Sequence, residues 1–105
     1  MRSDVGNKMM HEAVAQELTE LYARKNADYG DSFHRSYLDW GMTMAAIRLG
    51  DKYNRFVSLL KKGGVARVND ESMRDTLIDL ANYAIMTIME IDRENEEEGA
   101  EDGNE

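Results

Sequence analysis

The 105-residue chain contains no proline, and this absence constrains its fold more than any other feature. Proline breaks helices and punctuates loops, so a chain without it can run in long uninterrupted helices. Eight methionines and a scarcity of β-branched runs also favour helix over sheet. The sequence therefore predicts an all-α fold.

Apolar residues recur at steps of three and four along three segments, which predicts three main helices. Between the first and second segments, DYGDSFHRS (residues 28–36) reads as a loop broken at Gly30. Gly63 and Gly64 are expected to end the second helix, and Asn69 or Asp70 to cap the third. The expected helices cover residues 7–26, residues 37–62 or 41–62, and residues from 69 or 70 onward.

The third helix carries an apolar stripe wider than one neighbouring helix needs. Three helices in about 85 residues also make a thin core, so we expect a homo-oligomer, a dimer or higher, whose chains together complete a helical bundle. The stripe consists of Met73, Leu77, Leu80, Ala81, Ala84, Ile88 and Ile91, widened by Ile78, Ile85 and Met89.

The formal charge of −8 is concentrated at one end of the chain. Residues 90–105 contain nine acids and one base, so residues 1–89 are neutral. A neutral folded part argues against binding of polymeric nucleic acid, although a local basic pocket for a phosphorylated ligand stays open. We expect one all-α nucleotide-handling domain over residues 1–94 and a disordered acidic tail over residues 95–105.

Several classes of protein are disfavoured by composition. No apolar run approaches 18 residues, so no membrane segment is expected. The first residues lack an apolar signal core, and the chain has no cysteine for disulfides, thiolate metal sites or nucleophilic catalysis. The expected location is the cytoplasm, which is the bacterial host cytosol if the chain is encoded by a phage.

The third helix holds acids at four-residue steps: Glu71, Asp75 and Asp79, with Asn82 three residues further. Side chains at this spacing share a helix face, where like charges repel unless a cation lies between them. Mg²⁺ prefers such carboxylate oxygens, so these acids are candidate metal ligands. The alternative is a set of salt bridges to basic residues of the second helix or to Arg74.

The second helix places three cations on one face: Arg48, Lys52 and Arg55. Such a group can hold the oxygens of a phosphate chain, and Lys25 is a further candidate phosphate ligand. Asp51 lies among the cations and could add a metal ligand. The alternative is again pairing between the cations and the acids of the third helix.

The predicted loop carries two acids and an aromatic residue beside Gly30. Tyr29 could stack on a base, and Asp28 and Asp31 could bind a ribose or a metal, with Asn82 as a further contact to base or sugar. The alternative is an ordinary turn in which Asp31 or Ser32 caps a following short helix.

Three segments together resemble the phage and bacterial family called nucleotide modification associated domain, type one. They are KNADYGDSF, AAIRLGDKYNRFVSLL and NDESMRDTLIDLANYAIM, and the likeness extends over roughly residues 15–90. That family is similar to the all-α nucleoside triphosphate pyrophosphohydrolases, the MazG and dimeric dUTPase group. The resemblance implies helical oligomers that hold Mg²⁺ with Glu and Asp on two helices and cleave a nucleotide into its monophosphate and pyrophosphate.

Carried over to this chain, the resemblance places Asp79 at the aspartate of the group's ExxD motif. Thr76 stands at the glutamate position of that motif, and Asp75 is the nearest acid. The group's ExxE motif matches Glu17 and Glu20 literally, although these could belong to a solvated helix face, and Asp51 is the acid in the second segment.

The expected function is a Mg²⁺-dependent (or Mn²⁺-dependent) nucleoside triphosphate pyrophosphohydrolase of phage nucleotide metabolism. Asp51, Asp75 and Asp79 would be catalytic, and the same three acids with Glu71 would hold the metal. One alternative is a nucleotide-binding module without turnover, a sponge or sensor of a nucleotide such as a host signalling nucleotide. Another is a structural subunit of a nucleotide-modifying complex.

Overall fold

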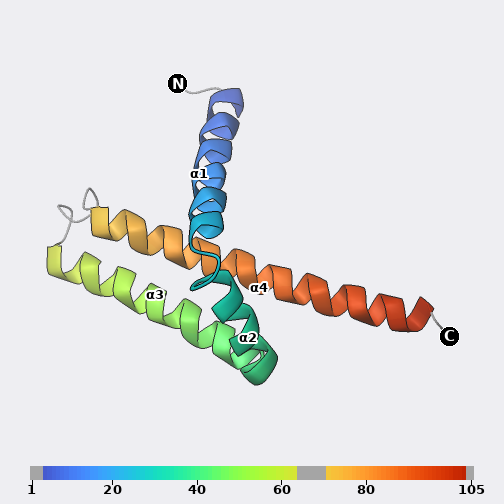
Figure 1. The fold of residues 1–105 in the computed structure, drawn as a ribbon. Coiled ribbons are helices and arrows are strands. Elements are labelled where there is room, and N and C mark those ends of the chain that lie inside the picture. Colours follow the sequence, from blue (N-terminus) through green and yellow to red (C-terminus); the bar gives the residue numbers. More distant parts are fainter. Residues whose placement is uncertain (1–3, 64–70, 104–105) are drawn as a thin grey trace.

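The computed structural model describes residues 4–63 and 71–103, and within these ranges it contains four helices and no strand. The all-α prediction is therefore confirmed, with one helix more than the three expected. No helix of the described part is long and apolar enough to cross a membrane. The helices are α1 (Asp4–Arg24), α2 (Gly30–Trp40), α3 (Met42–Gly63) and α4 (Glu71–Gly103) (Figure 1).

The additional helix, α2, begins where the sequence predicts a loop. Phe33 and Tyr37 are four residues apart, share one face, and are both buried, so packing stabilises a helix there. The break falls instead at Gly41, which has a φ of 66° and donates its N–H to the carbonyl of Tyr37 at 2.7 Å. This left-handed conformation favours glycine, so of the two expected starts of the second helix the later one, at residue 41, is confirmed, and the segment from residue 37 belongs to α2.

α3 and α4 form an antiparallel hairpin, and α2 packs across the end of this pair where α3 begins (Figure 1). The core at this end joins α2, α3 and α4 through Phe33, Tyr37, Met44, Ala45 and Met86. α1 projects away from the hairpin and touches it mainly through α4. The chain is consequently extended, with a radius of gyration of 17.0 Å.

Of the two ends of α4, only the carboxyl-terminal one can be compared with the sequence predictions. Its proposed cap at Asn69 or Asp70, like Gly64 after α3, lies outside the described residues. At the other end α4 continues to Gly103, into the acidic segment for which composition predicts disorder. Glutamate is a good helix former, and residues 91–99 are all exposed, so this end extends the helix without contributing to the core.

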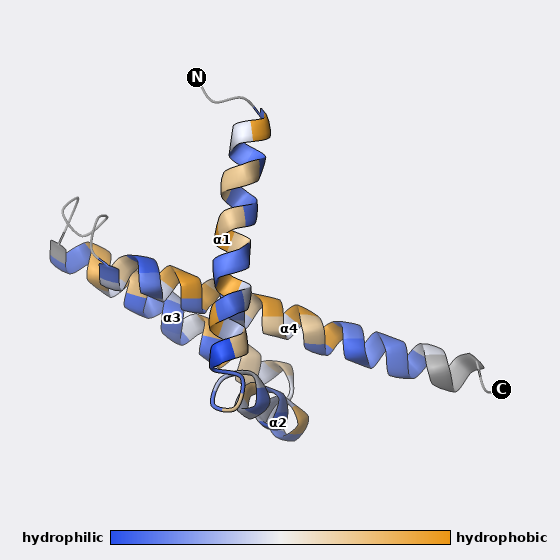
Figure 2. Ribbon diagram, turned by 45° about the horizontal axis from the view of Figure 1, so that its top comes forward, coloured by the Kyte–Doolittle hydropathy of each residue, from blue (hydrophilic) through white to orange (hydrophobic). Residues whose placement is uncertain are grey.

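The apolar stripe of α4 is only partly used within the chain. Met73 and Ile78 are buried, whereas Leu77, Ile85, Ile88 and Ile91 are exposed. Figure 2 shows apolar residues continuing along α4 as far as its hydrophilic acidic end. One side of the stripe therefore packs against the other helices and one side faces outward.

Candidate functional site

A tight turn over residues 25–29 joins α1 to α2 and positions Tyr29. The amides of Asp28 and Tyr29 donate to the carbonyl of Lys25 at 3.1 and 2.8 Å. Gly30 is buried at the end of the turn, where a Cβ atom would lie 2.6 Å from Oδ1 of Asn26 and 2.7 Å from the ring of Tyr22. The glycine of the DYGDS segment is thus required by close packing.

Asp79 on α4 is the centre of a group drawn from three elements. The Tyr29 hydroxyl donates to Oδ1 of Asp79 at 3.2 Å, and Nζ of Lys52 on α3 lies 3.2 Å from Oδ2. Burial and the negative charge of Asp79 both raise the pKa of the Tyr29 hydroxyl. The phenol therefore stays protonated and acts as a fixed donor to the carboxylate.

Aromatic rings lie directly beside this group. The Tyr83 ring is 5.4 Å from that of Tyr29 and 5.8 Å from that of Phe33, centroid to centroid. Nζ of Lys52 lies 6.0 Å from the centroid of Tyr83, at the outer limit of a cation–π contact. The rings border a small hollow of about 90 Å³, here called the aromatic hollow, lined by Asp28, Tyr29, Ser32, Phe33, Arg48 and Tyr83.

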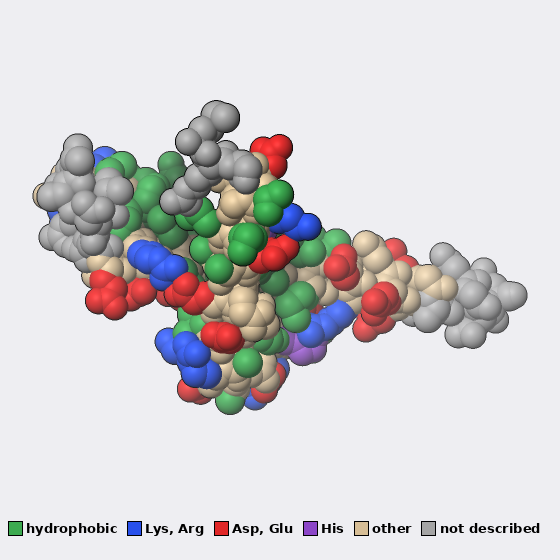
Figure 3. All heavy atoms as spheres, turned by 90° about the horizontal axis from the view of Figure 1, so that it is seen from above, with side chains coloured by type: hydrophobic (Ala, Val, Ile, Leu, Met, Phe, Trp, Pro, Cys, Tyr) green, Lys and Arg blue, Asp and Glu red, His purple; other side chains and the backbone are tan. Residues whose placement is uncertain are grey.

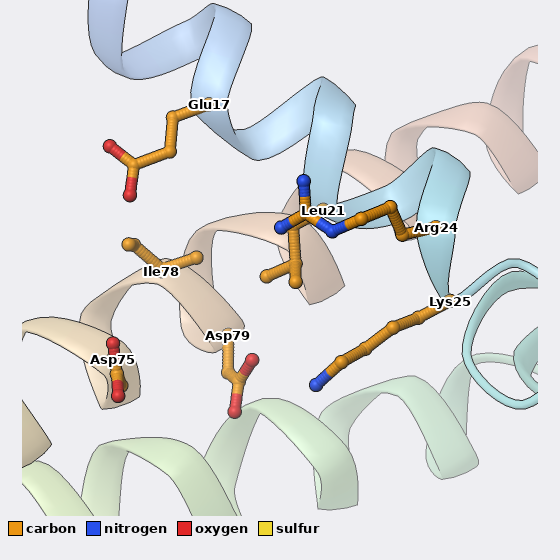
Figure 4. A pocket seen from close by; sticks show the side chains of 7 residues that line it. All are labelled: Glu17, Leu21, Arg24, Lys25, Asp75, Ile78 and Asp79. Atoms are coloured by element: carbon orange, nitrogen blue, oxygen red, sulfur yellow. The ribbon is translucent and has the colours of Figure 1, made fainter.

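A larger space of about 330 Å³ lies between the end of α1 and the first half of α4. Its charged lining is mixed in sign, so we call it the mixed-charge hollow. In Figure 4 the ammonium of Lys25 points toward the carboxylate of Asp79, and Asp75 projects from the preceding turn of α4. Its lining consists of Glu17, Leu21, Arg24, Lys25, Asp75, Ile78 and Asp79.

Glu17 at the edge of this hollow is held by Arg74 on α4. The guanidinium donates to both carboxylate oxygens, at 2.7 and 2.6 Å, which is a bidentate ion pair between α1 and α4. The hydrogen bonds and charge of Arg74 lower the pKa of the Glu17 carboxyl. Because both side chains are about half exposed, the pair orients Glu17 more than it stabilises the fold.

The structure brings together part of the predicted site. Asp79, Lys52 and Tyr29 are in direct contact, and Asp75 and Lys25 line the same hollow as Asp79. Asp28 and Arg48 line the aromatic hollow instead.

Other predicted residues have different surroundings. Nε of Arg55 donates to the hydroxyl of Thr76 at 3.2 Å, and Asp31 accepts a hydrogen bond from Asn26 at 3.1 Å. Asn82 is buried and donates to the carbonyl of Leu18 at 3.3 Å, which ties α4 to α1. Asp51 and Glu71 are exposed and line neither hollow.

Carboxylates and histidines are not gathered into a preformed metal cage. Among residues 4–63 and 71–103, no three acids or histidines lie close enough together to hold an ion by themselves. Asp75, Asp79 and Glu17 nevertheless border one space, and Lys52 is the cation now in contact with Asp79. The interhelical pairing considered from the sequence is thus present for Lys52 and Asp79.

Two residues of the site were missed by sequence reasoning. Arg24 ends α1 directly before the KNADYGDSF segment, and Tyr83 follows Asp79 by one helical turn. The four-residue spacing of Asp75, Asp79 and Tyr83 was the available signal for the tyrosine. Arg24 had no comparable signal, since its role depends on where α1 crosses α4.

The sequence model of one protein family, nucleotide modification associated domain 1, matches residues 25–91. The chain belongs to this family. The matched range begins at Lys25 and includes the turn, the aromatic rings and Asp79, while Glu17 and Arg24 precede it. No match to a curated protein or to a solved structure was found.

Proposed function

We propose that the protein is a Mg²⁺-dependent pyrophosphohydrolase that cleaves a nucleoside or deoxynucleoside triphosphate into its monophosphate and pyrophosphate. The observation that carries the proposal is the lining of the mixed-charge hollow. Asp75 and Asp79 face the same space as Arg24 and Lys25. A site for metal-bound polyphosphate needs both signs of charge, because acids hold the cation while bases hold phosphate oxygens.

The donor set fits Mg²⁺ in the way this ion usually binds beside phosphates. Mg²⁺ keeps several waters and takes one or two carboxylates plus substrate oxygens, so a closed cage of protein ligands is not needed. Asp75 and Asp79 would supply the carboxylates, with Glu17 facing them from α1. Bound Mg²⁺ supplies charge neutralisation on the phosphates and a water acidic enough to attack the α-phosphorus.

The remaining side chains have roles that follow from their positions. Arg24 and Lys25 would bind phosphate oxygens, and Lys52 would transfer its contact from Asp79 to the phosphates when the metal arrives. The hydroxyl of Tyr29 holds Asp79 in one orientation. Tyr83 offers a ring face for stacking against a base at the neighbouring aromatic hollow. The match to nucleotide modification associated domain 1 supports a nucleotide as the ligand, and we further propose that the reaction is of the MazG and dimeric dUTPase type and belongs to phage nucleotide metabolism.

A second function is favoured by the ion pairs of the acids. Asp79 is in contact with Lys52, and Glu17 is held by Arg74, so both carboxylates are already balanced by cations. A protein of this design could bind a nucleotide without hydrolysing it and would act as a sponge or sensor. Its binding would depend on the cations and rings but not on a divalent metal.

Both functions are tested by incubating the protein with normal and modified nucleoside and deoxynucleoside triphosphates in Mg²⁺, with products resolved by mass spectrometry. We expect monophosphate and pyrophosphate, and loss of at least about a hundredfold of the rate in Asp79→Asn, because removal of a metal ligand costs on this order. The control is Asp39→Asn, the same substitution at an exposed residue of α2 outside both hollows. Circular dichroism verifies that both variants are folded.

If the folded protein forms no product from any of the nucleotides, the proposed pyrophosphohydrolase function is refuted. The sponge then requires that a nucleotide raise the melting temperature in EDTA, and that Lys25→Ala remove this effect while Arg35→Ala on α2 retains it. A ligand at 100 times its Kd adds about 2.7 kcal/mol to the unfolding free energy, which is readily measured. If no nucleotide stabilises the protein, it is neither an enzyme nor a nucleotide sponge, and the result would fit a structural subunit of a nucleotide-modifying complex.

A further inference from the structure

We propose that two copies of this chain pair through α4 in antiparallel orientation, using a heptad stripe that the described helices of the same chain leave partly exposed. The stripe, here called the α4 seam, consists of Leu77, Ala81, Ala84, Ile88 and Ile91. Their steps of four, three, four and three residues repeat every seven, which is the spacing of a helix–helix seam. This inference concerns a surface of the molecule that the proposed nucleotide site does not use.

Three of the five seam residues are exposed in the single chain, and Ala81 and Ala84 are partly buried. Leu77, Ile88 and Ile91 have relative exposures of 42%, 56% and 38%, and neighbouring Ile85 has 44%. Scattered exposed apolar residues are common, but a row continuing over four turns of one helix is not. In Figure 3, which looks down on α1, hydrophobic side chains gather around α1 where it meets the hairpin.

The extended shape of the chain indicates how much surface is available. Its radius of gyration is 17.0 Å, against about 13 Å for a compact chain of this length. Its accessible area is 7847 Å², against roughly 6000 Å² for a compact monomer of this mass. A stable interface covers about 800 Å² of each partner, so the excess is sufficient, even though the acidic end of α4 contributes part of it.

Charge decides the orientation of the two helices. Residues 90–99 of α4 carry six acids and one base. A parallel pair would bring two of these acidic segments together, whereas an antiparallel pair separates them to opposite ends. Antiparallel pairing places each acidic segment beside the first half of the other α4, which carries Glu71, Asp75 and Asp79 besides Arg74, so it lowers the repulsion between the acidic segments without removing it.

The sizes of the seam residues fix the register. One antiparallel alignment sets each alanine of the seam against an isoleucine, with Ala81 opposite Ile91 of the partner subunit and Ala84 opposite Ile88 of the partner subunit. The same alignment sets Arg74 opposite Glu98 of the partner subunit. Alternation of small and large residues fills the space between two helices without overlap. The two-fold axis then passes near Ile85.

A hollow beside the seam has the position that this register requires. It has a volume of about 180 Å³ and lies between α1 and α4, next to Ala81. Its largely apolar lining suits the side chain of Ile91 from the partner subunit. The lining consists of Val14, Leu18, Arg74, Leu77, Ile78 and Ala81. Exposed Val5 and Met9 on α1 continue the apolar surface beyond the hollow.

The first test is the mass of the full chain in solution, measured by light scattering or sedimentation. We expect twice the chain mass of 12.0 kDa for the native protein and the single mass for Ile88→Glu. Ile88 is exposed in the single chain, so this variant is expected to fold. The control is Leu38→Glu, which places the same charge at a 69% exposed position on α2 and should remain dimeric.

The register is tested with single cysteines, which the absence of natural cysteine makes unambiguous. Ile85→Cys should form a disulfide with its own copy, because both residues lie beside the two-fold axis. Leu77→Cys should not, since the antiparallel register separates its two copies by roughly 27 Å along the helices. A mixture of Leu77→Cys and Asn95→Cys should cross-link, because these positions oppose each other.

A monomer at about 1 mM protein would overturn the proposal, because even millimolar affinity populates a dimer there. An assembly that Ile88→Glu leaves intact would overturn it as well. Self-linking of Leu77→Cys would overturn the antiparallel orientation.

Discussion

Replacement of Tyr29 by phenylalanine removes one hydroxyl and leaves the ring contact with Tyr83 in place. The lost hydrogen bond goes to a charged acceptor, a class worth about 1.5–3 kcal/mol in buried surroundings. Asp79 is 31% exposed and is also paired with Lys52, so water and the lysine compensate for part of the loss. We expect Tyr29→Phe to lower the unfolding free energy by about 1 kcal/mol at pH 7.

The assay is urea denaturation followed by circular dichroism, which gives the unfolding free energy. In a separate thermal denaturation, the melting temperature is expected to fall by roughly 4–8 °C for a domain of this size. The matched control is Tyr53→Phe, the same change at a 57% exposed tyrosine of α3, with an expected effect near zero. Both variants keep the aromatic ring, so a difference between them reports the hydroxyl.

The pH dependence provides a second readout of the same contact. Because the pKa of Tyr29 is raised in the folded state, its contribution is fully present below the unfolded pKa of about 10. Above pH 10 the unfolded chain releases a proton that the folded chain keeps, so stability falls as pH rises. One tyrosine adds at most about 1.4 kcal/mol per pH unit to this fall, less when half-buried. The hydrogen bond to Glu94 also raises the pKa of Tyr37, so Tyr37 still contributes to the loss of stability at high pH in the Tyr29→Phe variant.

The reasoning would be refuted by two results together. Tyr29→Phe and Tyr53→Phe would have equal unfolding free energies at pH 7, and the loss of stability above pH 10 would match that of the native protein. The hydroxyl of Tyr29 would then make no contact with Asp79 that matters to folding, and its assignment as the residue orienting that acid would fail.

Two further stability predictions follow from close packing and from burial, each measured by urea denaturation. Gly30→Ala should lower the unfolding free energy by about 1–3 kcal/mol, because the added Cβ would overlap the Tyr22 ring. The control is Gly50→Ala, which has open space around it and should be neutral or stabilising. Equal effects of the two substitutions would contradict this prediction. Glu90→Ala should cost about 2 kcal/mol, because this 3% exposed carboxylate lies 2.6 Å from the His34 ring and also pairs with Arg93. The exposed Glu96→Ala is the control, and an equally small loss in both variants would count against a role for these contacts.

The helical class and most helix positions could be predicted because they depend on local patterns. Spacing of apolar residues located α1, α3 and the start of α4 to within a few residues. The loop predicted over residues 28–36 is confirmed for residues 28–29 only, and the short helix that was the alternative begins at Gly30. A longer loop was favoured because glycine, aspartate and serine are weak helix formers. Packing of Phe33 and Tyr37 against the hairpin outweighs that weak preference. Such tertiary packing cannot be predicted from the local composition.

The sequence predicted acidic residues of the candidate site, but it did not predict which of them line the same hollow. The four-residue step between Asp75 and Asp79 places both on one helix face, and both line one hollow. The step from Glu71 to Asp75 has the same spacing, yet Glu71 lies at the exposed start of α4, beyond the point where α1 crosses. Asp51 shares a helix with Lys52, but only Lys52 contacts Asp79.

By itself, the sequence determined the all-α class, the acidic end of the chain, the family resemblance later matched over residues 25–91, and the seven-residue spacing of the α4 seam. These properties depend on periodicity, charge and short motifs, which are local. Only the tertiary structure decided that α1 crosses α4 where Glu17 and Arg24 face Asp75 and Asp79, and that Tyr29 and Lys52 converge on Asp79. Such encounters are set by how helices far apart in the chain pack together, because their crossing point depends on the fit of whole helix faces and not on any one motif.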